Sequence, residues 1–174
     1  MFNTISRMLH TGLLTEPLPA SDTTTSPLIT MQKDLVEILG RALCIRHVDA
    51  GSCNGCELEI QALNNPYYNL EGVGIKFVAS PRHADLLLVT GPVSVNMEEA
   101  LKRTYDAVPD PKIVVALGDC GACGGLFGTS YASRGSIANV IPVNHTITGC
   151  PPSPTAILGG ILQTVRSTLS EVHR

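Results

Sequence analysis

The residues of this 174-residue sequence best suited to chemistry are cysteines in glycine-rich segments. Cys53 and Cys56 form one C-x-x-C pair in "DAGSCNGCELEI", and Cys120 and Cys123 form a second in "ALGDCGACGG". Cys150 lies further along the chain, in "HTITGCPPSP". Cysteine sulfurs can form a redox dithiol, bind zinc or hold an iron–sulfur cluster. The spacing of these residues must distinguish the three chemistries.

A four-iron, four-sulfur (4Fe–4S) cluster is the chemistry that the spacing favours. A redox dithiol would use Cys53 and Cys56 alone and would leave the other cysteine loops unexplained. A zinc site could take both C-x-x-C pairs, but residues 57–119 lie between them, whereas zinc ribbons have about 15–20 intervening residues. A 4Fe–4S cluster takes four thiolates, and the proline directly after Cys150 is typical of such clusters. Spacing alone leaves open whether Cys123 or Cys150 is the fourth ligand.

Glycines are crowded around these cysteines. A glycine lets the backbone approach a bulky cofactor and presents amide N–H groups to its sulfurs. Ordinary turns account for some of these glycines, but not for their concentration beside cysteines. The candidate cofactor-binding glycines are Gly51, Gly55, Gly118 and Gly149, and the same segments also contain Gly121, Gly124 and Gly125.

The elements that must position the cysteines alternate between strands and helices. Short apolar runs predict strands at "LCIRHV", "GIKFVAS", "DLLLVTG" and "KIVVALG". Helical spacing is seen in "CELEIQALNN", "NMEEALKRTYDAV" and "PTAILGGILQTVRSTLSEV". Continuous apolar runs indicate strands buried on both faces, so we expect a doubly wound α/β fold with a parallel sheet.

The cysteines fall where such a fold binds ligands, which is beyond the carboxyl ends of the strands. Cys53 and Cys56 follow the first predicted strand, and Cys120 and Cys123 follow "KIVVALG". Cys150 follows the short apolar stretch "NVIPV". The sixth cysteine, in "LCIRHV", lies within a strand and is expected in the core.

The first 30 residues differ in composition from the rest of the chain. Residues 1–14 have apolar side chains at roughly helical spacing, and the residues after them are rich in Pro, Ser and Thr, as in an extended linker. The segment 1–30 is either a disordered tail or an arm that binds a partner or a membrane surface. From a helix predicted at 31–42 onward, we expect one cluster-binding domain, 31–174.

Composition excludes several classes of protein. The net charge of −3 gives no clustered basic face, so nucleic-acid binding is not expected. No stretch approaches the ~20 continuous apolar residues that span a bilayer, and the first residues lack the pattern of a signal peptide. We therefore expect an intracellular protein whose cysteines are ligands or buried thiols. Only 16% of the residues are charged, which predicts a surface partly covered by partners.

Four segments in this order resemble the small subunit of nickel–iron hydrogenases: "CNGCELEI", "SPRHADLLLVTGPV", "PDPKIVVALGDCGACGG" and "GCPPSP". The sequence is most similar to the membrane-bound, energy-converting group, which includes formate hydrogenlyase and CO-induced hydrogenases. That group is homologous to the 20 kDa cluster subunit of respiratory complex I. The resemblance runs from about residue 34 to the end of the chain, which stops after the cysteines of one cluster, as in the energy-converting type.

The resemblance implies a flavodoxin-like domain that holds one 4Fe–4S cluster. Mapped residue by residue, the implied ligands are Cys53, Cys56, Cys120 and Cys150. Cys123 occupies a position where relatives commonly have another small residue. No catalytic residue is implied in this chain, because a nickel–iron large subunit cleaves or forms H2. By this resemblance, the cluster is expected to exchange single electrons with that centre and with a ferredoxin-like iron–sulfur subunit.

The resemblance also implies a location and a rival function. We expect a cytoplasmic chain, peripheral on the inner face of the cell membrane, whose N-terminal arm binds membrane-arm subunits of the complex. The alternative is a complex I-type quinone oxidoreductase, in which the same cluster passes electrons to quinone. Complex I subunits have adjacent cysteines, whereas Cys53 and Cys56 are spaced as in hydrogenases.

Three polar residues near the cysteines allow more than one interpretation. Glu57 follows Cys56 at the start of a predicted helix, where a carboxylate either stabilises the helix dipole or takes part in proton coupling. His47 lies in a strand and is expected in the core or at an interface. Asp119, beside Cys120, is expected to cap its loop.

Overall fold

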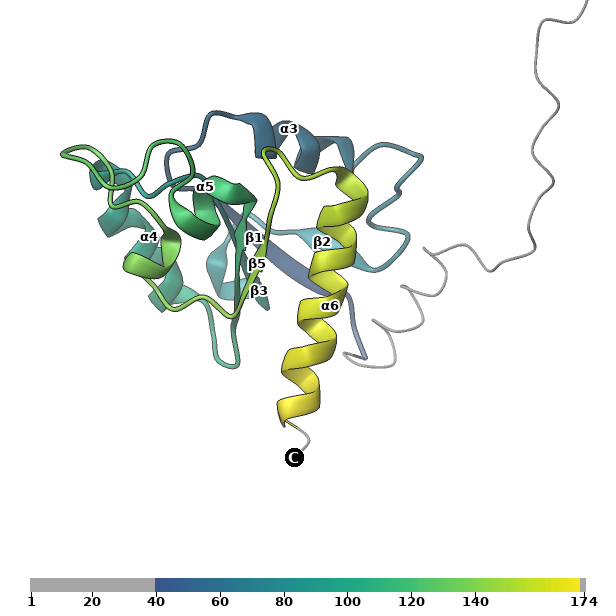
Figure 1. Cartoon of the computed structure of the whole chain (residues 1–174). Helices are drawn as coiled ribbons and strands as arrows, with labels where there is room; N and C mark the ends of the chain where they lie inside the picture. The colour runs from purple at the N-terminus through teal and green to yellow at the C-terminus, as the bar shows by residue number, and fades with distance from the viewer. Residues whose placement is uncertain (1–39, 173–174) are drawn as a thin grey trace, which may run out of the picture.

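The computed structural model describes residues 40–172, which form a five-stranded parallel sheet with helices on both faces (Figure 1). The strand order is β2-β1-β3-β4-β5, which is that of flavodoxin-like folds. The doubly wound α/β fold predicted from the sequence is therefore confirmed. The strands are β1 (Leu43–Asp49), β2 (Ile75–Phe77), β3 (Leu86–Thr90), β4 (Ile113–Leu117) and β5 (His145–Ile147). The helices are α3 (Gly55–Ala62), α4 (Val95–Ala107), α5 (Gly118–Cys123) and α6 (Pro154–Val172), with 3-10 turns at Pro81–His83 and Ile137–Asn139.

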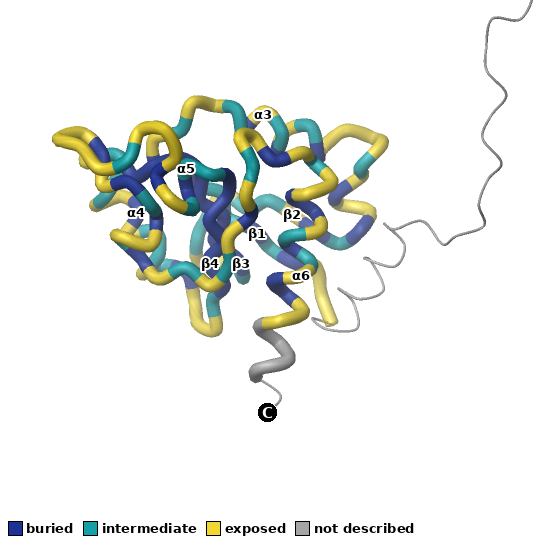
Figure 2. The backbone as a smooth tube through the Cα atoms, in the orientation of Figure 1, coloured by how far each residue is buried: buried dark blue, intermediate teal, exposed yellow. Residues whose placement is uncertain are grey.

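Side chains of the central strands alternate between two apolar layers. Leu86 and Leu88 of β3 pack with Ile157 of α6 on one face of the sheet. Leu87, between them, packs with Leu101 of α4 on the other face. Every residue of β3 and of β4 is buried, so these strands form the dark interior of Figure 2. Burial on both faces explains why these runs are apolar at every position.

β1 is less buried than the sequence predicted. Only its first three residues pair with β2, because β2 is three residues long. Among residues 40–172, no strand pairs with the later part of β1 on that side, and Arg46 and His47 line a groove there. Cys44, expected in the core, is only half-buried.

Two elements differ from the sequence prediction. The apolar stretch at 139–143 is not a strand, and β5 instead begins at His145. Asn144 fixes that start, because its Oδ1 accepts a hydrogen bond from Val114 N at 2.8 Å and its own N donates to Val114 O at 2.9 Å. The segment that contains Cys120 and Cys123, expected to be a loop, is the short helix α5.

Two adjacent glycines in α6 provide a test of the packing between this helix and β5. A Cβ at Gly160 would lie 2.6 Å from Ile147 Cδ1, whereas a Cβ at Gly159 would have nothing within 4 Å. Gly159→Ala is therefore expected to stabilise the fold by about 0.5–1 kcal/mol, since alanine is the better helix former. Gly160→Ala is expected to lose that gain or to destabilise, because Ile147 must move. Chemical denaturation measures the free energy of unfolding of both variants. Equal changes in the two would contradict the close packing of Gly160 against Ile147.

Part of the predicted organisation lies outside the described residues. The N-terminal arm at 1–30 and most of the helix expected at 31–42 are in this category, so the boundary between arm and domain stays a prediction. Residues 40–42 are not helical. Within 40–172, no helix is long and apolar enough to cross a membrane.

Candidate functional site

Four cysteines line one cavity at the carboxyl ends of the strands, where flavodoxin-like folds bind ligands. Cys53 follows β1, Cys120 and Cys150 follow β4 and β5, and Cys56 lies in the first turn of α3. The cavity has a volume of about 140 Å³. Its other lining residues are Ser52, Gly55, Gly91, Asp119, Gly149 and Pro151.

A network of hydrogen bonds shapes the loop between β1 and α3. Asp49 Oδ1 accepts hydrogen bonds from Gly51 N at 2.8 Å and from Ser52 N at 2.7 Å. Ser52 Oγ in turn accepts one from Asn54 N at 3.1 Å. Asn54, the N-cap of α3, has a φ of 71°, a conformation that asparagine tolerates better than most residues. The loop therefore ends in a fixed turn that places Cys53 before the helix.

Asp119 joins the loops of Cys120 and Cys150. Its Oδ1 accepts a hydrogen bond from Gly149 N at 2.8 Å, and its own N donates to Gly149 O at 3.0 Å. The sequence predicted that Asp119 caps its own loop, but its side chain binds the backbone of a loop 30 residues away. This pair of bonds joins two of the three segments that carry the cavity cysteines.

We expect Asp119→Ala to lower both the stability and the iron content of the protein. The variant loses a charge-assisted hydrogen bond to a backbone amide, which contributes about 1.5–3 kcal/mol. Asp119→Asn keeps an oxygen acceptor and is expected to lose less. Asp106→Ala, on the exposed surface of α4, serves as the control. Iron per chain and the free energy of unfolding are the measurements, and wild-type values for Asp119→Ala would contradict the role assigned to this carboxylate.

Two glycines leave room for cysteine sulfurs to pass close to the backbone. Gly118 has a φ of +81°, and a Cβ there would lie 2.7 Å from Cys56 Sγ. Gly125 has a φ of +54°, and a Cβ there would lie 2.7 Å from Cys120 Sγ. Both distances are shorter than real Cβ contacts, so any larger residue would displace a sulfur. These positions therefore require glycine for space as well as for conformation.

The other candidate glycines have different surroundings. Gly55 and Gly149, two of the sequence candidates, line the cavity. Gly51 does not line the cavity. A Cβ built on Gly51 would lie 3.1 Å from the Cβ of Ser94. Gly91, at the end of β3, lines the cavity but was not a sequence candidate. A glycine directly after a predicted buried strand was the available signal for it.

The local electrostatics disfavour thiolates without a positive partner. Burial, followed by the charges of Glu57 and the neighbouring cysteines, raises the pKa of Cys56 to about 12. Burial and then the charge of Cys150 also raise the pKa of Cys120. Bound metal ions stabilise thiolates and release their protons. Ionisation of Cys56 and Cys120 is therefore favoured by a cation bound in the cavity.

Cys123 is separate from this group. It is exposed, and its Sγ donates to the carbonyl oxygen of Asp119 at 3.2 Å. It does not belong to the residues that line the cavity. The structure thus brings together Cys53, Cys56, Cys120 and Cys150, which are the four ligands implied by the family resemblance.

Glu57 of α3 and His47 of β1 form a second polar group, between the helix and the sheet. Glu57 is buried, and neither of its carboxylate oxygens accepts a hydrogen bond from the described residues. His47 Nε2 lies 3.8 Å from Glu57 Oε1 and 3.0 Å from Thr90 Oγ1. Burial lowers the pKa of His47, although the charge of Glu57 opposes this. Glu57 thus lies in the first turn of α3, as predicted, but faces the interior.

The residues present fit a 4Fe–4S cluster. The cavity offers four thiols, which is the number such a cluster takes. Within residues 40–172, no three His, Cys, Asp or Glu side chains converge on one point as a single metal ion requires. The four thiols instead surround a shared volume. Glycine at 118 and 125 keeps the space beside two of the sulfurs open.

Comparison with known proteins identifies relatives among subunits of hydrogenases, formate hydrogenlyase and NADH-quinone oxidoreductases. The chain is 47% identical over 128 residues to the probable membrane-bound hydrogenase subunit mbhJ of Pyrococcus furiosus, which covers 74% of this chain and 77% of that protein. It is 38% identical over 156 residues to formate hydrogenlyase subunit 7 of Escherichia coli, covering 90% of this chain and 61% of that protein. It is 43% identical over 109 residues to a subunit of the NADH-quinone oxidoreductase of Herpetosiphon aurantiacus, covering 62% and 60% of the two chains.

Solved structures show the same fold. A chain of the archaeal membrane-bound sulfane sulfur reductase superimposes with a TM-score of 0.66 and 32% identity, covering 80% of this chain and 76% of that chain. A chain of an NAD+-reducing [NiFe]-hydrogenase superimposes with a TM-score of 0.57 and 19% identity, covering 73% and 93%. The second likeness concerns the fold alone.

The fold and the cavity together define a class of flavodoxin-like domains with a cysteine-lined site at the carboxyl ends of a parallel sheet. Residues 53–164 match the family "NADH ubiquinone oxidoreductase, 20 Kd subunit", and the chain belongs to this family. It is a subunit of an oxidoreductase complex of the membrane-bound hydrogenase or complex I type. The family resemblance predicted from the four sequence segments is confirmed.

Proposed function

We propose that this chain is the electron-transfer subunit of a multisubunit, membrane-associated nickel–iron hydrogenase. In this proposal it carries one 4Fe–4S cluster, proximal to the nickel–iron site of a large partner subunit. Cys53, Cys56, Cys120 and Cys150 are the proposed ligands. The proposed cofactor-binding glycines are Gly55, Gly118 and Gly149; Gly51, the fourth sequence candidate, is not among them because it does not line the cavity. A ferredoxin-like iron–sulfur subunit is the proposed second electron partner.

The observation that carries this proposal is the cavity in which four cysteines from three separate loops meet, with Cys123 outside it. Two of the most similar relatives, one 47% and one 38% identical, are named as subunits of hydrogen-metabolising complexes. The spaced Cys53–Cys56 pair also agrees with the hydrogenase pattern rather than with adjacent cysteines.

Each group in the cavity has a defined task in this function. A bound 4Fe–4S cluster supplies one-electron oxidation and reduction. The four cysteines provide its thiolates, and Asp119 keeps the Cys120 and Cys150 loops in register. Cys56 is partly buried, and solvent exposure is one of the factors that set a cluster's potential. The chain itself breaks no substrate bond.

A complex I-type quinone oxidoreductase is the second candidate, favoured by the 43% identity to an NADH-quinone oxidoreductase chain. Metal and quinone analysis of the complex purified through this chain distinguishes the two. Nickel together with iron, and H2-dependent reduction of a viologen dye, are expected for the hydrogenase. Iron with bound quinone and without nickel would replace the proposal by the complex I alternative.

We further propose that residues 1–28 bind the complex to a membrane-arm subunit, on the inner face of the cell membrane. This segment offers Arg7 as its one basic residue apart from His10, and weak amphipathic segments need basic charge to bind lipid. Deletion of 1–28 is expected to preserve iron and nickel content while releasing the complex from membranes. Full activity in the membrane fraction after deletion would identify the segment as a dispensable tail.

A further inference from the structure

Ser52 is the one residue with a side-chain hydroxyl among those that line the cysteine cavity. The cavity thiols lose their protons when they bind metal. The other polar side chain of the cavity, Asp119, accepts a hydrogen bond from Gly149 N through its carboxylate. Ser52 is therefore the side chain of the cavity that can donate a hydrogen bond once a cofactor is bound.

Two contacts hold the backbone of Ser52 in place. Its N donates a hydrogen bond to Asp49 Oδ1, at the end of β1, at 2.7 Å. Gly91, directly after β3, lies so close that a Cβ built on it would be 2.5 Å from Ser52 N and 2.6 Å from Ser52 Cα. Glycine at 91 thus leaves the space in which Ser52 passes the end of the strand. Ser52 is therefore fixed to the ends of both β1 and β3.

The hydroxyl of Ser52 has an unused donor. Its Oγ accepts a hydrogen bond from Asn54 N at 3.1 Å. A serine hydroxyl can accept two hydrogen bonds and donate one. Within residues 40–172, the bond from Asn54 is the only one that this hydroxyl makes, so its O–H proton has no acceptor among them. The oxygen is held by the bond that it accepts, and its proton is available to a group in the cavity.

We propose that the Ser52 hydroxyl donates a hydrogen bond to a sulfur of the cluster in this cavity and thereby raises the cluster's reduction potential. This inference rests on the proposed function. Hydrogen bonds to the sulfurs are one of the factors that set the potential of an iron–sulfur cluster. The reduced cluster carries one more negative charge than the oxidised cluster, and a donor binds more strongly to a more negative acceptor. The bond from Ser52 therefore stabilises the reduced state more than the oxidised state.

Ser136 makes the same local turn outside the cavity. Its Oγ accepts a hydrogen bond from Ala138 N, two residues further on, at 3.1 Å, which is the spacing and the distance found for Ser52 and Asn54. Both serines are partly exposed, but Ser136 does not line the cavity. Ser136→Ala thus removes an equivalent turn bond without changing the cavity, which makes it the matched control.

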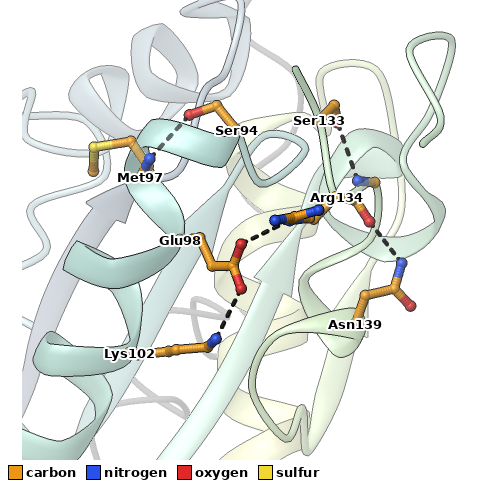
Figure 3. A network of polar contacts seen from close by, with 8 residues as sticks. Ser94, Met97, Glu98, Lys102, Ser133, Arg134 and Asn139 are labelled. Atoms are coloured by element: carbon orange, nitrogen blue, oxygen red, sulfur yellow. Dashed lines mark hydrogen bonds and ion pairs between the residues drawn. The ribbon is translucent and has the colours of Figure 1, made fainter. Parts of the chain in front are cut away.

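Ser94 provides a second control, for lost stability (Figure 3). It is the N-cap of α4, and its Oγ accepts a hydrogen bond from Met97 N at 3.3 Å. Ser94→Ala removes this cap and is expected to lower the free energy of unfolding. Because Ser94 does not line the cavity, we expect its substitution to leave the cluster's potential unchanged.

The test is a redox titration of the purified complex, followed by electron paramagnetic resonance. The signal of this chain is the one that Cys150→Ser removes or converts. Ser52→Ala is expected to lower the ratio of reduced to oxidised cluster at a fixed potential about tenfold, which is a shift of about 59 mV to lower potential for a one-electron couple. Ser136→Ala and Ser94→Ala are expected to keep the wild-type potential. Iron per chain should stay at the wild-type level in all three variants, because none of these serines is a proposed ligand.

Electron–nuclear double resonance of the reduced cluster detects the donated proton directly. We expect one proton coupling that exchanges in D2O to be present in the wild type and in Ser136→Ala, and to be absent from Ser52→Ala. An unchanged potential and unchanged couplings in Ser52→Ala, with full iron, would overturn the inference and leave the proposed function intact. An equal shift in Ser136→Ala or Ser94→Ala would also overturn it, because lost turn bonds or lost stability would then explain the effect. Absence of a 4Fe–4S signal from the wild-type complex would instead overturn the proposed function.

Discussion

Cys150→Ser is expected to abolish or convert the 4Fe–4S signal in electron paramagnetic resonance, whereas Cys123→Ser is expected to preserve it. Cys150 lines the cavity with three other cysteines, and Cys123 does not. A serine hydroxyl is a poor substitute for a thiolate as a ligand of iron, so loss of one cavity cysteine leaves a cluster with three good ligands. Iron per chain should fall in Cys150→Ser and remain at the wild-type value in Cys123→Ser.

The two substitutions control for each other, because both cysteines are exposed and both variants change one sulfur to oxygen. Circular dichroism of both proteins establishes that the fold survives. The opposite result, with the signal lost in Cys123→Ser and kept in Cys150→Ser, would refute the proposed ligand set. It would also revive a site built from the two C-x-x-C pairs.

Gly118→Ala is expected to lower cluster content severalfold. The backbone of Gly118 has a φ of +81°, and this conformation costs a residue with a side chain about 1–2 kcal/mol. In addition, the new Cβ would lie 2.7 Å from Cys56 Sγ, so the sulfur must leave its position. Iron per chain and the visible absorption of the cluster are the measurements.

Gly74→Ala separates conformational strain from displacement of the sulfur. Gly74 has a φ of +85°, nearly the same as Gly118, but a Cβ there would have nothing within 4 Å. We expect this variant to be destabilised by a similar 1–2 kcal/mol of strain while keeping its iron. Equal iron loss in both variants would mean that strain alone, and not the contact with Cys56, explains the effect at Gly118.

The fold was predictable from the sequence because its central strands are buried on both faces. The runs at β3 and β4 are apolar at every position, and this pattern predicts parallel strands. The short edge strand β5 was not predicted, because it has three residues and is secured by Asn144 rather than by an apolar run. The groove along the second half of β1 was also not predictable, since it depends on the length of β2.

The site was partly predictable. Sequence alone placed the cysteines after strands and left Cys123 and Cys150 as alternatives, and the family resemblance selected Cys150. The ligand set itself stays a prediction that the cysteine substitutions test. The bond from the Asp119 carboxylate to the loop of Cys150 became visible only in the structure, because its partner Gly149 lies 30 residues away in the sequence.

The two C-x-x-C pairs separate what the sequence determines from what only the tertiary structure determines. The sequence by itself determined the residue types, the spacing and the strand before each pair. The first pair straddles the start of α3, so that both Cys53 and Cys56 line the cavity. The second pair lies wholly within α5, where Cys120 lines the cavity but Cys123 Sγ donates to the carbonyl of Asp119. Identical spacing thus gives different geometry, because the point at which each helix begins depends on contacts with distant loops.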